Sequence, residues 1–428
     1  MCVMTSCEGE WSRLVKRADL LVAHCRELLT LVETEGDMLG IIRDGAVAAL
    51  DGRIVATGRS NDVARSVTLL PGAVVIHASD RTVMPGFVDA HTHLVHAGSR
   101  EDEFTRRLAG EDYLEILAAG GGILSTVLAT RQASDVELER LAMQRLRQML
   151  AFGTTTAEVK SGYGLDTETE LRILRVIQRL QSCQPVSLIP TFLGAHAVPL
   201  EYRGCEDEYV DLVCREMIPA VAAEGLAVFC DVFCERGVFN VAQSRRVLAT
   251  AAAFGLKLRL HADELSDSGG ASLAAELRCA SADHLTHAST DGLQRMASAG
   301  VAAGLLPGAS HFLDHPFADA RAMLDEHGLK VYLATDYNPG TSPMLSMPAV
   351  ISLACAKMKM TVAEAVCAAT RVPAEVLGVG DVVGTLEVGK TADLLVLNVG
   401  DYRQLAYGVG MNPVATVVKS GRVVLSRD

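Results

Sequence analysis

Two histidines, His91 and His93, stand two positions apart in the stretch PGFVDAHTHL, directly after a short apolar run. Side chains at positions i and i+2 of an extended segment point to the same face, so these two imidazoles can converge on one point. Imidazole nitrogens are common ligands of zinc and iron. The spacing therefore predicts a metal site at the end of a strand.

Two further ligand candidates follow later strand-like runs: His261 in LRLHADE and Asp336 in LATDYNPG. Three imidazoles and one carboxylate suit Zn²⁺ or iron and leave one coordination position for water. A metal can lower the pKa of such a water from about 15.7 toward about 7, which makes it a nucleophile near neutral pH. The sequence predicts a hydrolytic centre with one metal ion, Zn²⁺ or iron (2+ or 3+), bound by His91, His93, His261 and Asp336.

A hydrolytic centre also needs a group that moves protons between the water and the leaving nitrogen. Glu264 stands three residues after His261 and is predicted to serve there. The alternative for Glu264 is a carboxylate that interacts with a helix N-terminus. His284, in SADHL, could polarise the scissile carbonyl or help to deprotonate the water; it could also be a fifth ligand or a packed histidine.

Arg100 and Tyr163 are candidates for holding a substrate carboxylate. Arg100 lies just beyond the first strand-like run and can form two parallel hydrogen bonds to a carboxylate. Tyr163, in KSGYGLD, could add a phenol donor. The alternatives are a surface salt bridge for Arg100 and a helix-entry turn for Tyr163.

Lys160 is relevant because some two-metal hydrolases bridge their ions with a carboxylated lysine at a barrel strand end. It follows the second strand-like run, which is too early in the chain for that bridge. We therefore expect a mononuclear site. The other histidines of this part of the chain are expected to be packed or surface residues: His96, His287, His311, His315 and His327.

These side chains must be positioned by a repeated strand and helix pattern. Eight strand-like runs alternate with helical stretches such as 167–181 and 207–225, and the runs cover 86–93, 153–161, 186–196, 226–235, 256–264, 281–287, 301–307 and 330–340. The pattern fits a (β/α)8 barrel and, locally, also a doubly wound sheet. The polar residues favour the barrel, because they trail strand after strand and a barrel gathers those ends into one ring.

The sequence pattern at both ends of the chain differs from the alternating strands and helices of the middle. Short apolar stretches and turns fill 40–84, where Asp-Gly occurs twice at positions expected to be hairpin turns, 44–45 and 51–52. The same pattern returns in 384–400 and 413–425. We therefore predict a small, discontinuous, β-sandwich-like domain built from both termini. The predicted boundaries are 1–84 and 382–428 for this accessory domain and 85–381 for the catalytic barrel.

Composition excludes several classes of protein. The formal charge is −13, from 39 Lys and Arg against 52 Asp and Glu, so a nucleic-acid partner is not expected. The 11 cysteines are odd in number and scattered, which is typical of reduced thiols. No run of about 18 apolar residues is present. We expect a soluble cytoplasmic protein that acts on a small molecule and does not bind membranes.

With these residues in view, the chain resembles the amidohydrolase superfamily of metal-dependent hydrolases over roughly 80–425. The resemblance rests on PGFVDAHTHLVHAGSREDEF, GGGILSTVLATR, FLGAHAVP, HADE, SADHL, LLPGAS and LATDYNPGTSP, and KSGYGLDTETEL is its most specific motif. It implies a barrel with an accessory domain and, from the family, a homodimer. Within the superfamily it points to the members that hydrolyse the ring of 4-imidazolone-5-propanoate to N-formimidoyl-L-glutamate in L-histidine degradation.

The resemblance also implies roles for individual residues. It assigns the metal to His91, His93, His261 and Asp336, gives Asp336 a role in proton relay, and places Glu264 near the ring and water and His284 beside the metal as a candidate base. Substrate contacts are implied for Arg100, Tyr163, His196, Glu264, Asn338, Gly340 and Thr341. Two alternatives stay open: a ring deaminase of the same superfamily, which needs no carboxylate clamp, and a non-catalytic scaffold, which usually loses its metal ligands.

Overall fold

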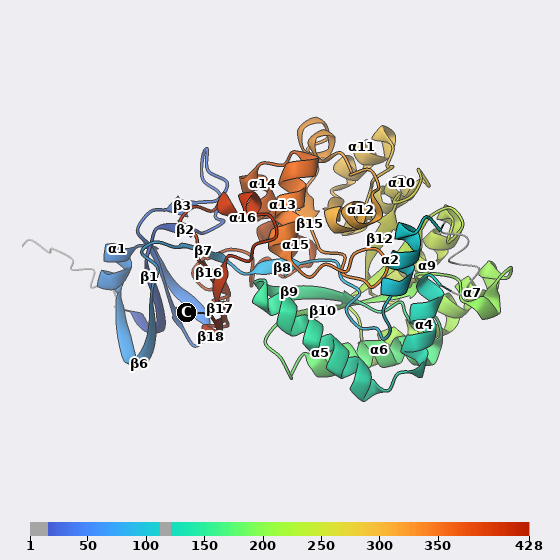
Figure 1. Cartoon of the computed structure of the whole chain (residues 1–428), viewed down its shortest axis with the longest axis horizontal. Helices are drawn as coiled ribbons and strands as arrows, with labels where there is room; N and C mark the ends of the chain where they lie inside the picture. Colours follow the sequence, from blue (N-terminus) through green and yellow to red (C-terminus); the bar gives the residue numbers. More distant parts are fainter. Residues whose placement is uncertain (1–15, 112–120, 428) are drawn as a thin grey trace, which may run out of the picture.

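A computed structural model describes residues 16–111 and 121–427. Eight parallel strands follow one another in sequence order, each hydrogen-bonded to the next (Figure 1). They are β8 (Phe87–Asp89), β9 (Thr154–Lys160), β10 (Ser187–Ala195), β11 (Phe229–Cys234), β12 (Lys257–Ala262), β13 (Ser281–His284), β14 (Ala302–Leu305) and β15 (Val331–Leu333). Every strand-like run predicted for the barrel contains one of these strands.

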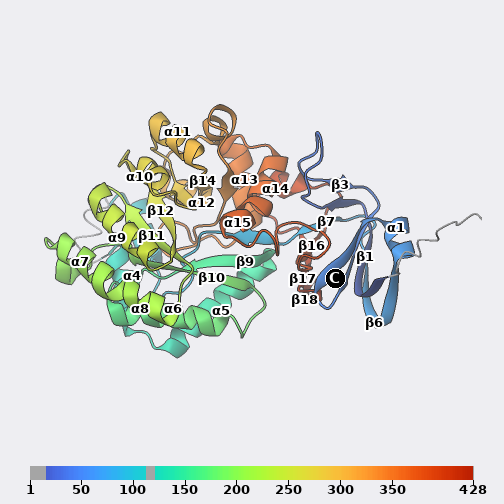
Figure 2. The ribbon, with the colours of Figure 1, turned by 180° about the vertical axis from the view of Figure 1, so that it is seen from behind.

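The sheet closes just beyond β8 and β15. Thr92 and Tyr337 form a parallel bridge, and the His93 peptide nitrogen donates to the Tyr337 carbonyl at 2.8 Å. The predicted (β/α)8 barrel is therefore confirmed, and the doubly wound sheet is excluded. The helices surround the strands (Figure 2).

The helices of the barrel connect its successive strands, except for the last three, which follow β15. In chain order they are α2 (Glu101–Leu108), α4 (Ile123–Gln132), α5 (Asp135–Ala151), α6 (Thr167–Leu180), η1 (Leu200–Tyr202), α7 (Glu206–Leu212), η2 (Val213–Met217), α8 (Ile218–Glu224), α9 (Val241–Ala253), α10 (Gly270–Glu276), α11 (Thr290–Ala299), α12 (Pro307–Leu313), η3 (Ala322–Glu326), α13 (Met347–Met358), α14 (Val362–Ala368) and α15 (Arg371–Val376). Among the described residues, none of these helices has the length and apolar character needed to cross a membrane.

The amino ends of the barrel strands are closed by apolar side chains. Val88, Phe229 and Ala302, which lie at or near the starts of their strands, pack with Ala374 and Leu377. Since α15 plugs this end, the opposite end of the barrel is left for chemistry.

Two smaller sheets lie beside the barrel (Figure 1). A four-stranded sheet has the order β5-β4-β1-β6, and a six-stranded sheet has the order β18-β17-β16-β7-β2-β3. Their elements are β1 (Lys16–Cys25), β2 (Glu27–Leu29), β3 (Ile41–Ile42), β4 (Gly45–Leu50), β5 (Arg53–Arg59), α1 (Ser60–Ser66), β6 (Val67–His77), β7 (Thr82–Pro85), β16 (Leu394–Leu397), α16 (Gln404–Tyr407), β17 (Val414–Lys419) and β18 (Arg422–Ser426).

The six-stranded sheet joins both ends of the chain. The amino-terminal strand β7 pairs with the carboxy-terminal strand β16, Met84 opposite Leu395. One apolar cluster contains residues of both sheets, among them Leu20, Val47, Val83 and Leu394, which makes the pair a sandwich. The domain boundaries at 84/85 and 381/382 stay a prediction.

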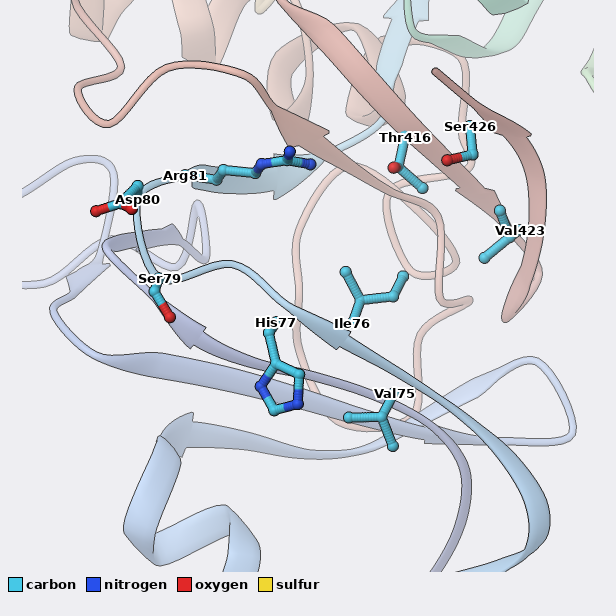
Figure 3. Close-up of a pocket in the computed structure, with 9 residues that line it drawn as sticks. All are labelled: Val75, Ile76, His77, Ser79, Asp80, Arg81, Thr416, Val423 and Ser426. Carbon is cyan, nitrogen blue, oxygen red and sulfur yellow. The ribbon is translucent and has the colours of Figure 1, made fainter. Parts of the chain in front are cut away.

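A cleft of about 470 Å³ opens between β6 and the carboxy-terminal strands of this sandwich (Figure 3). Val75, Ile76 and His77 line one side, and Thr416, Val423 and Ser426 line the other. None of the residues predicted to act on substrate or metal lines it. The predicted chemistry belongs to the barrel.

One detail of the amino-terminal prediction is wrong. Asp51 and Gly52, both at positive φ, do form the tight turn between the paired strands β4 and β5. The other Asp-Gly pair, at 44–45, is no hairpin turn, because β3 pairs with β2 whereas β4 pairs with β1 and β5. The chain passes there from one sheet to the other.

Candidate metal centre and active site

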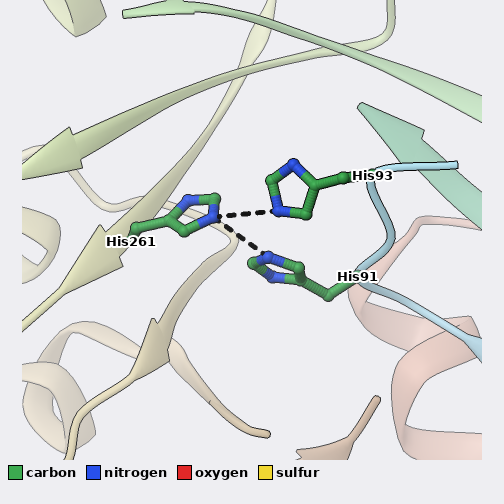
Figure 4. Close-up of side chains that lie close together, drawn as sticks. All are labelled: His91, His93 and His261. Carbon is green, nitrogen blue, oxygen red and sulfur yellow. Dashed lines mark hydrogen bonds between the residues drawn. The ribbon is translucent and has the colours of Figure 1, made fainter. Parts of the chain in front are cut away.

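The four predicted ligands lie close together at the carboxyl end of the barrel. Figure 4 shows the three histidines among them. His261 Nε2 lies 3.1 Å from His91 Nε2 and 3.4 Å from His93 Nε2. Asp336 Oδ1 lies 3.5 Å from His91 Nε2 and 3.4 Å from His93 Nε2. All four side chains are buried.

These separations fit a metal ion. Two donors at about 2.0–2.2 Å from a tetrahedral ion are about 3.3–3.6 Å apart. Two unprotonated imidazole nitrogens this close to each other and to a carboxylate are the donor set that a divalent cation prefers. The residues present therefore fit one divalent ion.

Barrel closure explains why Asp336 reaches the two histidines of the first strand end. The Asp336 peptide nitrogen donates to the His91 carbonyl at 3.0 Å, so the two segments run side by side. Asp336 and His284 both have positive φ, 52° and 75°. This conformation is strained for residues other than glycine, and such strain gathers at functional sites.

Buried carboxylates stand behind two of the ligands. Asp283 Oδ2 lies 2.7 Å from His91 Nδ1, and Asp231 Oδ2 lies 3.0 Å from His261 Nδ1. A carboxylate on Nδ1 fixes the tautomer that leaves Nε2 free to bind a metal and raises the basicity of the ring. Both carboxylates therefore orient ligands.

Two fully buried cations neutralise these carboxylates from below. Lys160 Nζ lies 2.8 Å from both Glu158 and Asp231, and Arg259 lies 2.9 Å from Asp283. The Lys160 ammonium is therefore engaged in ion pairs with two carboxylates.

Burial keeps most of the imidazoles neutral. It lowers the pKa of His91 and of His93 well below the ordinary value. Burial also acts to lower the pKa of His261, but the Asp231 carboxylate outweighs it and raises that pKa. Burial raises the pKa of the Asp336 carboxyl group. Because metal ligands must be deprotonated, neutral imidazoles at this site favour metal binding.

Glu264 and His284, the predicted proton-transfer residues, contact each other. Glu264 Oε1 lies 3.5 Å from His284 Nδ1. His284 also forms, with His91 and Asp336, a second group whose ligand atoms lie within 4.8 Å of one another. Glu264 stands in a bend well before α10, so the alternative of a helix N-terminal carboxylate is not realised.

Arg100, Tyr163 and His196, predicted to contact substrate, surround the same end of the barrel. The Tyr163 ring lies 6.0 Å from His93 and 5.4 Å from His196, centroid to centroid. His196 stacks on His93 at 4.9 Å. The Arg100 guanidinium packs so closely on Gly340 that a Cβ there would lie 2.0 Å from it.

Asn338 and Thr341, two other predicted substrate contacts, bond to each other. Asn338 Oδ1 accepts from the peptide nitrogens of Gly340 at 2.9 Å and Thr341 at 2.7 Å. Its Nδ2 donates to Thr341 Oγ1 and to the Asp336 carbonyl, both at 2.8 Å. Asn338 therefore shapes the loop that follows the Asp336 ligand.

The sequence prediction missed the residues beneath the ligands: Glu158, Asp231, Arg259 and Asp283. A signal was present, because Arg259 and His261 are two residues apart on β12 and so share one face. The same holds for Glu158 and Lys160 on β9. Charged residues at alternate positions of otherwise apolar barrel strands indicate a polar interior.

Comparison with known proteins shows the family of this chain. Two relatives called imidazolonepropionase are each 50% identical to this chain: one from Symbiobacterium thermophilum, covering 96% of this chain and 98% of its own, and one from Geobacillus kaustophilus, covering 95% and 98%. Residues 82–424 match the Amidohydrolase family. The chain belongs to the amidohydrolase family, among the imidazolonepropionases.

Solved structures of two deaminases share the fold. An adenosine deaminase from Xanthomonas campestris with bound zinc superposes with a TM-score of 0.72 at 19% identity, covering 96% of this chain and 94% of its own. The E. coli guanine deaminase gives a TM-score of 0.71 at 16% identity, covering 95% and 100%. At these identities the likeness concerns the fold alone.

Proposed function

We propose that this protein hydrolyses 4-imidazolone-5-propanoate to N-formimidoyl-L-glutamate, the ring-opening step of L-histidine degradation. One observation carries the proposal: the buried cluster of His91, His93, His261 and Asp336 has a cation, Arg100, packed on the loop that follows Asp336. That arrangement suits a small ring with a carboxylate tail. The 50% identity to imidazolonepropionases over nearly the whole chain supports it.

A divalent ion bound by His91, His93, His261 and Asp336 would supply an acidified water and a polarised ring carbonyl. Glu264 takes a proton from the attacking water, and His284, 3.5 Å from it, shares that proton or stabilises the carbonyl oxygen. The bond between the carbonyl carbon and the ring nitrogen then breaks. The leaving nitrogen receives the proton, with Asp336 as the proposed relay.

The propionate tail binds Arg100 and Tyr163 in this proposal. Arg100 donates from its Nε to Glu103 at 2.9 Å. No hydrogen bond from its two terminal nitrogens is seen among residues 16–111 and 121–427, so in this proposal both face the carboxylate. Burial raises the pKa of the Tyr163 phenol, which therefore stays a hydrogen-bond donor. His196 contacts the ring, and the loop of Asn338, Gly340 and Thr341 faces the substrate amide or the opened product.

The test is to supply 4-imidazolone-5-propanoate to metal-loaded protein and follow the loss of its ultraviolet band. Stoichiometric loss with formation of N-formimidoyl-L-glutamate is expected. No loss, together with release of ammonia from a nucleobase, would establish the deaminase alternative in its place. No reaction with either substrate by the metal-loaded protein would indicate a scaffold.

We further propose that the bound metal is zinc or iron, that the protein is a homodimer and that it acts in the cytoplasm. The nine cysteines among the described residues are free thiols, which supports a reducing compartment, while Cys2 and Cys7 lie outside those residues. Elemental analysis of protein purified without added metal tests the first point. Light scattering tests the second; a mass near 45.5 kDa would contradict it.

A further inference from the structure

Glu170, a fully buried carboxylate on α6, has no part in the chemistry described so far. It stands in the motif KSGYGLDTETEL, seven residues after Tyr163. Among the described residues it has no cationic partner; its hydrogen bonds come from backbone N–H groups and the Ser161 hydroxyl. Burying a carboxylate without a cationic partner costs free energy. The hydrogen bonds that Glu170 accepts offset this cost, and they hold the backbone groups that donate them.

The loop that follows β9 wraps around this carboxylate. The peptide nitrogen of Gly162 donates to Oε2 at 2.9 Å, and those of Gly164 and Leu165 donate to Oε1 at 2.7 and 2.9 Å. Tyr163 is the residue between the two glycines, so its backbone is fixed on both sides by Glu170.

Close packing makes the loop depend on these contacts. Gly162 has a φ of 108°, and a Cβ at Gly164 would lie 2.7 Å from the Glu170 peptide nitrogen. The chain can follow this path only with glycine at both positions. Tyr163 itself is only 2% exposed and fills the space beside His93 and His196.

The same loop also sets the state of His196. The Gly162 carbonyl lies 2.9 Å from His196 Nδ1, and a carbonyl only accepts, so Nδ1 carries the proton. With Nδ1 bonded to this carbonyl, Nε2 is the ring nitrogen left to contact the substrate. Through its bond to Gly162, Glu170 therefore influences both Tyr163 and His196, the two residues proposed to contact the substrate.

We propose that Glu170 is a positioning residue for substrate binding: its carboxylate holds the 161–165 loop so that the Tyr163 hydroxyl and the His196 ring face the substrate. This rests on the proposed function, since it takes Tyr163 and His196 as substrate contacts. Glu170 touches neither substrate nor metal and acts only through the loop.

The first test is Glu170→Gln in the metal-loaded full chain. The amide has the same shape, but its NH₂ group faces backbone donors, so the loop loses at least one charge-assisted hydrogen bond. We expect KM for 4-imidazolone-5-propanoate to rise about tenfold or more, kcat to stay within about threefold, and metal content to be unchanged. An unchanged KM, or an equal loss in kcat, would overturn the proposal.

A double variant and a matched control separate positioning from general destabilisation. If Glu170 acts through Tyr163, the KM of Glu170→Gln with Tyr163→Phe stays near that of the worse single variant, whereas multiplied effects would contradict the proposal. Leu174→Ala removes a buried side chain of the same helix, four residues after Glu170, that makes none of the hydrogen bonds to the loop. If it reproduces the rise in KM, Glu170 is only structural.

A spectroscopic test does not depend on turnover. In ¹⁵N-labelled protein, His196 should show the tautomer with the proton on Nδ1, and Glu170→Gln should shift it toward a mixture; no shift would refute the role of Glu170. If the parent protein fails to turn over the substrate, the proposed function fails while this test still decides on Glu170. If Glu170→Gln does not fold, Gly164→Ala perturbs the same loop, and an unchanged KM and tautomer would overturn the proposal.

Discussion

At the scale of single residues, the candidate metal centre depends on pairs in which a buried carboxylate orients a histidine ligand. His91 can offer Nε2 to a metal because Asp283 holds its Nδ1, and Asp283 in turn is held by Arg259 and the Tyr332 hydroxyl. His261 has the matching relation to Asp231 and Lys160. The ligands alone would not define the geometry.

We expect Asp283→Asn to weaken metal binding about 10- to 100-fold, because the amide accepts the His91 proton poorly and leaves Arg259 undercompensated. Competition with a chromophoric chelator measures this affinity. Ser281→Ala is the control, since Ser281 contacts Arg259 at 3.1 Å but no ligand. Equal affinities for the parent and Asp283→Asn would contradict the role of this pair.

Arg100→Gln should raise KM for the substrate about 10- to 100-fold and leave metal content unchanged, because a charge-assisted contact to the propionate is lost. Steady-state kinetics on the loaded enzyme checks it. The control is Arg107→Gln on the same helix region, where Arg107 packs over Phe104 and Phe312. If both variants bind substrate like the parent, Arg100 is not the carboxylate clamp.

At the scale of elements, the barrel strands could be predicted because buried parallel strands are short apolar runs with polar residues at their ends. The structure of the segment 207–225 was harder to predict. Its pattern is helical throughout, but the structure divides it into α7, the π-helical turn η2 and α8. Pro219 lacks a peptide N–H, and its ring disturbs the preceding turn, which the wider π turn accommodates.

The interior charges beneath the metal could not be predicted, since a local pattern does not reveal which strand residues face the barrel axis until the register is known. His261 pairs with Asp283 across β12 and β13, a relation between strands that no single segment contains. The ligands and the candidate proton-transfer residues, by contrast, followed directly from strand-end positions. Their catalytic roles stay a proposal.

Glu364 provides a test of stability at this scale. It forms a capping box with Thr361 at the start of α14 and an ion pair with Arg321 at 2.7 Å. Partial burial acts to raise its pKa, but the bonds from Arg321 and Thr361 outweigh it and hold the pKa below the ordinary value. A carboxyl group with a lowered pKa stabilises the fold above its unfolded-state pKa, and this stabilisation is lost as the pH falls through the folded-state pKa.

Glu364→Gln should therefore lower the free energy of unfolding by about 0.5–1.5 kcal/mol at pH 7, and by progressively less as the pH falls below the ordinary carboxyl pKa of about 4.3. Urea unfolding at several pH values measures it. Glu375→Gln removes the exposed partner of Lys330 and should change stability little at either pH. A pH-independent loss in Glu364→Gln would show that the charge is not responsible.

At the scale of the whole molecule, the metal site lies where the barrel closes. Its ligands come from the segment after β8, from β12 and from the segment after β15, so a bound ion ties the first and last strands together. α15 closes the opposite end of the barrel, and the terminal sandwich lies beside it (Figure 1).

Removal of the metal should consequently lower the melting temperature by several degrees, and its return should restore it, since an ion that binds only the folded state stabilises that state. Thermal unfolding of chelated and reloaded protein checks this. The melting temperature of the Asp336→Asn variant should rise much less when metal is added. A melting temperature that is the same with and without metal would show that the ion does not stabilise the closed barrel.

The central claim is that side chains from three parts of the chain bind one ion. X-ray absorption at the metal edge, combined with elemental analysis of the loaded protein, tests it most directly. We predict one ion per chain with only nitrogen and oxygen neighbours, at about 2.0–2.2 Å if it is zinc. Two ions per chain, sulfur in the coordination shell, or retention of the ion in a His91→Ala and His261→Ala double variant would contradict it.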